Sequence, residues 1–162
     1  PHGVDRRFFK NKENELLKVN RKDRIKILYV STVTNYKHQC IVVEAVTQLR
    51  KSLHYNFNLD LVGHAYNPAL EKLKACLQRL DPCEKWARYL GKVDFLELNK
   101  NYFDADICVF ASTCENMPIT LLEMMASGSP IACSNRGPMP EVLNNSGVYF
   151  DPENVASLAE IA

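Results

Sequence analysis

Two glutamates, Glu115 and Glu123, flank a short apolar run in the segment STCENMPITLLEMMASGSP (112–130). Pro118 between them favours a helix that begins there, because proline is well tolerated in a first helical turn. Helical side chains lean back toward the N-terminus, so both carboxylates can reach ligand groups near the helix start. Carboxylates repel a diphosphate but accept charge-assisted hydrogen bonds from sugar hydroxyls. The alternative is that Glu115 only complements the helix dipole and Glu123 lies on a solvated face.

The start of the same helix also offers an anion site. The backbone N–H groups of Met117, Ile119 and Thr120 are expected at its positive end, where unpaired donors and the helix dipole favour phosphate. A nucleotide sugar supplies phosphate, ribose and hexose together. One ligand of this class would therefore satisfy both the amides and the two carboxylates.

A lysine lies in another polar loop, STVTNYKHQ (31–39), which follows a predicted strand. Lys37 can neutralise a diphosphate if it reaches over the end of that strand; the alternative is an ordinary surface lysine. His38 and His64 lie in similar loops but have no cysteine or carboxylate partners at metal-ligand spacing. We therefore expect no metal site.

The bulk properties fit one globular domain. The chain has 162 residues, 46% hydrophobic and 24% charged, as is typical of a soluble protein. Its formal charge of +1 gives no indication of a nucleic-acid partner. Six cysteines form no CxxC pair, and Cys40, Cys108 and Cys133 lie in apolar runs, so we expect reduced thiols with these three as small core residues. Neither a membrane-spanning run nor a signal peptide is visible, which favours a cytoplasmic location.

Hydrophobic periodicity predicts alternating strands and helices. The predicted strands are 25–31, 57–63, 86–91, 106–112, 130–134 and 147–150; the predicted helices are 38–53, 67–80, 94–105, one after Pro118, one in 139–145 and one beginning in 151–162. This alternation predicts βαβ units and a parallel sheet covered on both faces. Such sheets bind ligands beyond the carboxyl ends of their strands, where the loops 31–39, 63–68 and 112–118 are expected.

The stretch STCENMPITLLEMMASGSPIACSNRGPMPEVL closely resembles the signature of the retaining glycosyltransferases of family 4, also called glycosyltransferase group 1, which have the GT-B fold. The family's E-x7-E element falls on Glu115 and Glu123, its AxGxP turn on 126–130, and its later proline-glutamate pair on Pro140 and Glu141. The opening PHGVD resembles the junction between the two domains of these enzymes, and ILYVSTVTNYKH resembles their first strand and phosphate-binding loop. Five ordered motifs in one register are far more specific than the spacing of two glutamates.

The resemblance implies the C-terminal, donor-binding half of a two-domain enzyme. The implied fold is an α/β, Rossmann-like three-layer domain with a six-stranded parallel sheet in the order 3-2-1-4-5-6. Residues 1–22 would be an interdomain linker remnant and residues 23–162 the nucleotide-sugar-binding domain, with the N-terminal acceptor domain outside this chain. The fragment alone is expected to be inactive.

The resemblance also implies a reaction. A hexosyl group of mannose or glucose type would move from a UDP- or GDP-linked sugar to a glycan or lipid-linked acceptor, with retention at the anomeric carbon. Neither metal nor cofactor is implied, because lysine, arginine and helix dipoles stabilise the departing diphosphate. Such an enzyme would serve polysaccharide biosynthesis in the cytoplasm, with peripheral association at the cytoplasmic membrane face as an open option for the intact protein.

Each site residue receives a role from the same resemblance. Lys37 is expected to contact the donor diphosphate and Glu115 the transferred sugar, and these two are the expected catalytic residues. Glu123 is expected to bind the ribose. Further contacts to the phosphates, sugar and base are expected from Thr32, Gly63, Val93, Asn116, Met117, Ile119 and Thr120.

Two positions depart from the family pattern. Many relatives carry Gly-Arg where this chain has Ser31-Thr32, so the usual arginine partner of Lys37 is missing. A threonine can hydrogen-bond a phosphate but cannot neutralise it. Pro118 stands where relatives often have glycine, and it offers no N–H.

Several other functions compete with sugar transfer. A phosphate-receiver domain should carry paired acidic residues after its first strand, and a dinucleotide dehydrogenase should carry GxGxxG there; STVTNYK has neither. A sugar-nucleotide epimerase or phosphorylase of the same fold and a non-catalytic nucleotide-binding module stay open as alternatives.

Overall fold

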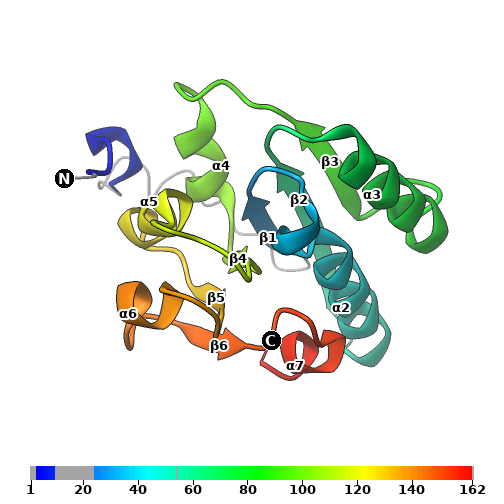
Figure 1. The fold of residues 1–162 in the computed structure, drawn as a ribbon. Helices are drawn as coiled ribbons and strands as arrows, with labels where there is room; N and C mark the ends of the chain where they lie inside the picture. Colours follow the sequence, from blue (N-terminus) through cyan, green and yellow to red (C-terminus); the bar gives the residue numbers. More distant parts are fainter. Residues whose placement is uncertain (1–2, 10–23, 54, 162) are drawn as a thin grey trace.

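A computed structural model describes residues 3–9, 24–53 and 55–161 of the chain. Its centre is one six-stranded sheet in the order β3-β2-β1-β4-β5-β6 (Figure 1), and every neighbouring pair of strands is parallel. The strands are β1 (Arg24–Val30), β2 (Asn56–Val62), β3 (Ala87–Gly91), β4 (Ile107–Phe110), β5 (Ile131–Ser134) and β6 (Val148–Phe150). The predicted α/β, Rossmann-like sheet and its strand order are confirmed.

Helices cover both faces of this sheet. They are α2 (Gln39–Ser52), α3 (Asn67–Leu80), α4 (Leu98–Asp104), α5 (Ile119–Ser127), α6 (Met139–Leu143) and α7 (Val155–Glu160), with the 3-10 turns η1 (Arg6–Phe8) and η2 (Asn35–Lys37). In Figure 1, α2, α3 and α7 lie on one side, and α4, α5, α6 and η1 lie on the other. The four consecutive residues Ile27–Val30 of β1 are all buried, as expected for a strand covered on both faces.

The strand order reverses between β1 and β4. β1 pairs with β2 from Arg24↔Asn56 to Val30↔Val62, while its other edge pairs with β4 through Leu28↔Cys108. The chain leaves β1 toward α2 and leaves β4 toward α5, on opposite faces of the sheet (Figure 1). Loops that diverge in this way open a crevice at the strand ends, which is where open α/β sheets bind ligands.

Most element bounds agree with the prediction within a few residues, and α3 has the predicted bounds 67–80. The clearest difference is α4, predicted over 94–105, which begins only at Leu98. Asp94 explains the delay, because its Oδ1 accepts the N–H of Leu96 (2.8 Å) and its carbonyl accepts the N–H of Glu97 (3.0 Å). This local pairing makes a turn in place of a first helical turn. Of the predicted linker 1–22, residues 3–9 are described and the others lie outside the described residues.

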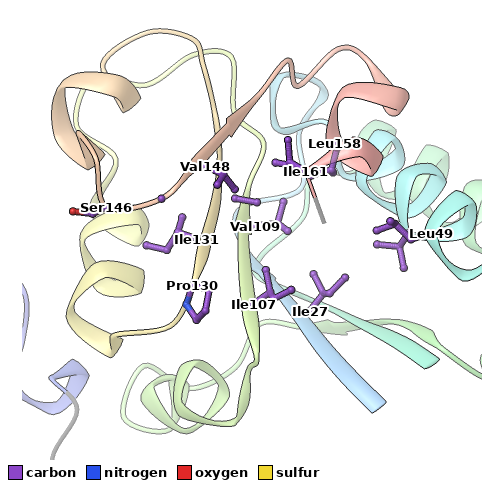
Figure 2. A pocket seen from close by; sticks show the side chains of 13 residues that line it. Ile27, Leu49, Ile107, Val109, Pro130, Ile131, Ser146, Val148, Leu158 and Ile161 are labelled. Atoms are coloured by element: carbon purple, nitrogen blue, oxygen red, sulfur yellow. The ribbon is translucent and has the colours of Figure 1, made fainter. Parts of the chain in front are cut away.

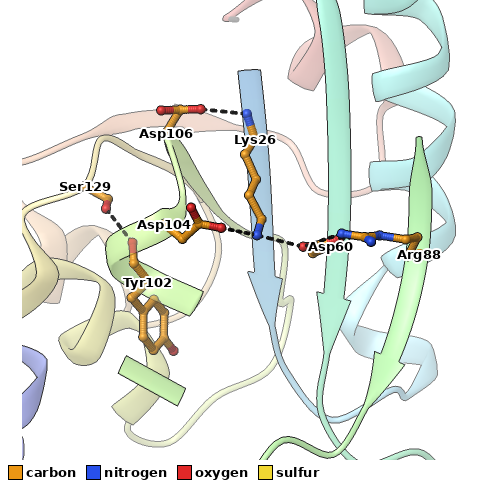
Figure 3. A network of polar contacts seen from close by, with 7 residues as sticks. All are labelled: Lys26, Asp60, Arg88, Tyr102, Asp104, Asp106 and Ser129. Atoms are coloured by element: carbon orange, nitrogen blue, oxygen red, sulfur yellow. Dashed lines mark hydrogen bonds and ion pairs between the residues drawn. The ribbon is translucent and has the colours of Figure 1, made fainter. Parts of the chain in front are cut away.

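A polar network crosses the sheet near the end of α4 (Figure 3). Lys26 Nζ lies 3.0 Å from Asp60 Oδ2 and 2.5 Å from Asp104 Oδ2. Arg88 on β3 donates to Asp60 Oδ1 through Nε (3.1 Å) and Nη2 (2.9 Å). The Asp60 side chain is only 2% exposed, and a carboxylate so deeply buried needs such partners. The network therefore holds β1, β2, β3 and α4 together.

Candidate functional site

Lys37 lies just past the end of β1, in η2, and its side chain is only 10% exposed. Nζ forms an ion pair with Oε1 of Glu115, whose side chain is 14% exposed. The ammonium lies 5.4 Å from the centre of the Phe110 ring, within the range of a cation–π contact. The buried Tyr29 hydroxyl donates to the Lys37 carbonyl at 2.7 Å and fixes the backbone there. Lys37 is therefore a buried, positioned cation and not an ordinary surface lysine.

Further contacts join the loop after β1 to the loop after β4. The N–H of Thr113 donates to the Tyr36 carbonyl at 2.9 Å, and Thr113 Oγ1 lies 3.1 Å from His38 Nε2. Burial lowers the pKa of His38, while Glu153 and Asp151 act in the opposite direction. The neutral imidazole is therefore favoured at neutral pH. These bonds join the loop after β1 to the loop after β4 at the strand-order reversal. The two residues of the Lys37–Glu115 contact are 78 positions apart in the sequence.

The start of α5 differs in one detail from the predicted anion site. The Ile119 N–H donates to the Met117 carbonyl at 3.0 Å, and the Leu121 N–H donates to the Pro118 carbonyl at 3.0 Å. Ile119 therefore uses its amide within the chain in this conformation. The amides of Met117 and Thr120 stay as predicted phosphate ligands, and the neighbouring Asn116 is exposed.

Glu123 is buried within α5, with 6% of its surface exposed. Its Oε2 accepts a hydrogen bond of 2.9 Å from the hydroxyl of Tyr102 on α4, and the Tyr102 ring packs edge-on against Phe8 at 5.6 Å. Burial raises the pKa of the Glu123 carboxyl, and the bond from Tyr102 opposes that rise. A solvated helix face is therefore excluded for Glu123. An ionised carboxylate has about four acceptor positions, so further hydrogen bonds can be added to it.

Gly63 ends β2 with a φ of +144°. A Cβ there would lie 2.1 Å from the Ser31 carbonyl oxygen, so only glycine lets β2 approach the loop after β1 this closely. The Gly63 N–H donates to the Gly91 carbonyl at 2.9 Å, which brings in the end of β3. Val93 lies two residues after Gly91 in the sequence and is half-buried. Gly63 and Val93, two of the residues predicted to contact the donor, thus follow neighbouring strands.

Thr32 is half-buried in the loop after β1. Its carbonyl accepts a hydrogen bond of 3.1 Å from Gln39 Nε2, which also donates to Ser31 Oγ at 2.9 Å. The backbone of the predicted phosphate loop is thereby anchored to the first residue of α2.

The structure brings some of the predicted residues together and reveals others. Lys37 and Glu115 contact each other, whereas the partner recorded for Glu123 in the described part of the chain is Tyr102. Tyr102 and Thr113 were not predicted, and no local pattern marks them. A pairing across 21 positions, as between Tyr102 and Glu123, depends on the packing of two helices.

A separate apolar pocket of about 370 Å³ lies between β4, β5, β6 and α7 (Figure 2). Ile131, Val148 and Leu158 are among its lining residues, and Ser146 is the one lining residue with a polar side chain. None of the predicted site residues lines it. Because charged and hydrogen-bonding groups gather at the strand ends instead, a polar ligand fits there better.

Comparisons with known proteins decide the family. Residues 24–162 match the model of the family described as glycosyl transferases group 1. The chain is 37% identical over 132 residues to O-antigen chain mannosyltransferase B of Escherichia coli, which covers 82% of this chain and 34% of that protein. The chain belongs to the group 1 glycosyl transferases. It thus spans about a third of the length of this relative.

Solved structures agree with the fold of this glycosyl transferase domain. HepE of Anabaena, solved in complex with UDP and glucose, superposes with a TM-score of 0.80 at 20% identity, covering 98% of this chain and 44% of that one. The C-terminal domain of the glycosyl transferase group 1 family protein LpcC from Francisella tularensis superposes with a TM-score of 0.80 at 22% identity, covering 98% and 85%. This chain therefore has the fold of one half of a GT-B enzyme.

Two features are absent from the part of this glycosyl transferase domain that the structure describes. Within residues 3–9, 24–53 and 55–161, no cluster of three or more His, Cys, Asp or Glu residues is placed to hold a metal ion. No helix in the same part of the chain combines the length and the apolar character needed to cross a membrane.

Proposed function

We propose that this chain is the donor-binding domain of a retaining glycosyltransferase, which moves a hexosyl group of mannose or glucose type from a UDP- or GDP-linked sugar to a glycan or glycolipid. The buried Lys37–Glu115 pair at the strand-order reversal supports this most directly. The name of the E. coli relative, a mannosyltransferase, agrees with the sugar class. The complexes of HepE with UDP and with UDP-glucose agree with a nucleotide-sugar donor.

In this proposal Lys37 stabilises the departing diphosphate. An ammonium has three N–H donors; one serves Glu115, and the others are available to phosphate oxygens. The charge that develops on the leaving group meets a cation that is already desolvated and oriented, which is where electrostatic stabilisation is most effective. Because Thr32 replaces the family's usual arginine, Lys37 carries this charge stabilisation together with the amides of Met117 and Thr120.

Glu115 and Glu123 divide the remaining contacts. One carboxylate oxygen of Glu115 accepts a hydrogen bond from Lys37, and the other accepts a hydrogen bond from a hydroxyl of the transferred sugar. Tyr102 holds one oxygen of Glu123, so the carboxylate is oriented to accept the ribose hydroxyls. Gly63 and Val93 lie beside the base, and Asn116 contacts the sugar and phosphates. Ile119 joins these contacts when its amide exchanges the Met117 carbonyl for the ligand.

The acceptor side of the reaction is assigned to a part of the intact enzyme other than this donor-binding domain. Acceptor contacts come from an N-terminal domain joined through residues 1–22, so the isolated chain binds donor without transferring sugar. Neither metal nor cofactor takes part in this scheme. The intact enzyme works in the cytoplasm and meets its glycan or lipid-linked acceptor there or at the membrane face.

A panel of UDP-, GDP- and ADP-sugars tests the proposal by thermal shift of this chain. A ligand present at 100 times its Kd adds about 2.7 kcal/mol of stability, which raises the melting temperature of a domain this size by roughly 5–10 °C. We expect one base to give such a shift and its sugar conjugate to exceed the bare diphosphate. If no nucleotide or nucleotide sugar shifts the transition at millimolar concentration, the proposed site is wrong.

A further inference from the structure

Two cysteines on neighbouring helices lie in direct contact. Cys40 is the second residue of α2 and Cys76 lies in α3, and the two thiols are close enough to shift each other's pKa. Cys76 Sγ also lies 3.9 Å from the Cys40 carbonyl oxygen, and Cys40 Sγ lies 3.9 Å from the Lys72 carbonyl oxygen. Each sulfur atom therefore lies against the backbone of the facing helix, where α2 packs on α3. Both thiols are free.

The two cysteines differ in their access to solvent. Cys76 is buried, with 6% of its surface exposed, and Cys40 is half-exposed. Cys40 packs against the core but is only partly buried, whereas Cys108 and Cys133 are fully buried as predicted. A reagent in solvent can therefore reach the Cys40 thiol, whereas the Cys76 thiol is shielded from it.

We propose that Cys40 and Cys76 form a redox-sensitive modification site, in which a peroxide oxidises Cys40 and Cys76 then closes a disulfide between α2 and α3.

A small pocket gives a peroxide access to Cys40. Its volume is about 180 Å³, and Cys40, Thr34, His38 and Lys72 are among its lining residues. A water molecule occupies about 30 Å³ in the liquid, so a peroxide fits with room to spare.

The surroundings favour the thiolate of Cys40, which is the reactive form. The hydrogen bond from Cys76 lowers the pKa of Cys40 to about 7, helped by Arg79 and Lys72 and opposed by burial and Glu44. The same contact and burial raise the pKa of Cys76. Arg79 and Glu44 pair with each other at 2.7 Å across the same two helices. Cys40 is accordingly the attacking sulfur, and Cys76 keeps its proton until the second step.

The chemistry balances in two steps. The Cys40 thiolate attacks one peroxide oxygen and the O–O bond breaks, which leaves Cys40 as a sulfenic acid and releases hydroxide that takes a proton to become water. The Cys76 sulfur then attacks the Cys40 sulfur. The S–S bond forms, the S–O bond breaks, and the hydroxide leaves as water with the Cys76 proton. In total, two thiols and one hydrogen peroxide give one disulfide and two waters, and a thiol reductant reverses the change.

The test is oxidation of the reduced chain with hydrogen peroxide, followed by intact-mass measurement and peptide mapping without reductant. We expect the loss of two hydrogen atoms per chain and a peptide that joins Cys40 to Cys76. Between pH 7.5 and pH 5.5 the rate should fall about 25-fold, because the thiolate fraction of a thiol with a pKa near 7 falls by that factor. Cys83→Ser and Cys114→Ser are matched controls, because both residues are exposed and neither should change the linkage.

Two further variants protect the test from a folding failure. Cys76→Ser should leave Cys40 as a sulfenic acid that dimedone traps, whereas Cys40→Ser should remove both the trapping and the linkage with an unchanged circular dichroism spectrum. A disulfide between any other pair would overturn the proposal. So would a Cys40 that reacts no faster than Cys83.

Discussion

Lys26 and Lys37 lie at opposite ends of β1, and each pairs with a carboxylate from a distant part of the chain. Lys26 lies between two carboxylates, Asp60 and Asp104, and Asp60 is shared with Arg88 (Figure 3). Lys37 lies beyond the strand, between loops at the strand-order reversal, and pairs there with Glu115. Lys26 thus lies within the strand and helps to hold the sheet together, whereas Lys37 lies past its end and is the lysine that we propose shares its pairing with a ligand. Their position relative to the carboxyl ends of the strands separates the two roles.

Removing Asp60 should have the largest effect on stability. Asp60→Ala removes the buried carboxylate that Lys26 and Arg88 share and leaves Lys26 paired with Asp104 alone. Removing one partner of a buried ion pair costs about 3–5 kcal/mol, and the remaining Lys26–Asp104 pair places the expected loss near the lower end of that range. Arg136→Ala is the control, because its ion pair with Asp151 is exposed on both sides (45% and 35%) and such pairs contribute at most about 1 kcal/mol. Urea denaturation gives both values. Equal losses for the two variants would mean that Asp60 has no special structural role.

Removing Lys37 should instead affect binding. Lys37→Ala should weaken nucleoside-diphosphate binding by roughly 1–3 kcal/mol, the scale of a hydrogen bond to a charged group, and should keep the fold. Lys74→Ala is a matched control, since Lys74 is a 60% exposed lysine of α3 paired with Glu71. Isothermal titration calorimetry of both variants with the nucleoside diphosphate measures the two affinities. If the Lys37 and Lys74 variants bind as tightly as the wild type, the Lys37–Glu115 pair is structural, like that of Lys26.

The elements of this fold were predictable because their signals are local. β-branched runs marked the strands, and five ordered motifs carried the family resemblance that gave the order of the strands in the sheet. The start of α4 was missed because the Asp94 side chain competes for backbone donors. The partners of individual side chains were harder to predict. Lys37, Glu115 and Glu123 were predicted to bind a ligand, but the Lys37–Glu115 contact and the Tyr102–Glu123 contact were not predicted. Such contacts join residues 21 to 78 positions apart, and the spacing within one sequence does not encode them.

The burial of Glu123 should appear as a smaller, pH-dependent cost in stability. Burial raises its pKa, so the folded state holds the proton to a higher pH than the unfolded chain does. The cost is absent below the unfolded value, near 4.3, grows as pH rises through the folded pKa, and is complete above it. Glu123→Gln should therefore be at least as stable as the wild type at neutral pH, with the difference vanishing at low pH.

Tyr102→Phe is the matched variant for that titration. It removes the bond that opposes the pKa rise, so it should lose stability above the folded pKa and regain it as pH falls. Thermal melts from pH 4 to pH 8 measure both curves. Parallel curves for the wild type and Glu123→Gln would contradict a buried, titrating carboxylate.

Comparing the two glutamates as ligand contacts tests the central claim most directly. Calorimetry on Glu115→Gln and Glu123→Gln, with the nucleoside diphosphate and with its nucleotide sugar, separates a sugar contact from a ribose contact. Glu123→Gln should weaken both ligands. Glu115→Gln should leave the nucleoside diphosphate nearly unchanged and weaken the nucleotide sugar by roughly 1–3 kcal/mol. Identical binding profiles for the two variants would contradict the division of roles between these carboxylates.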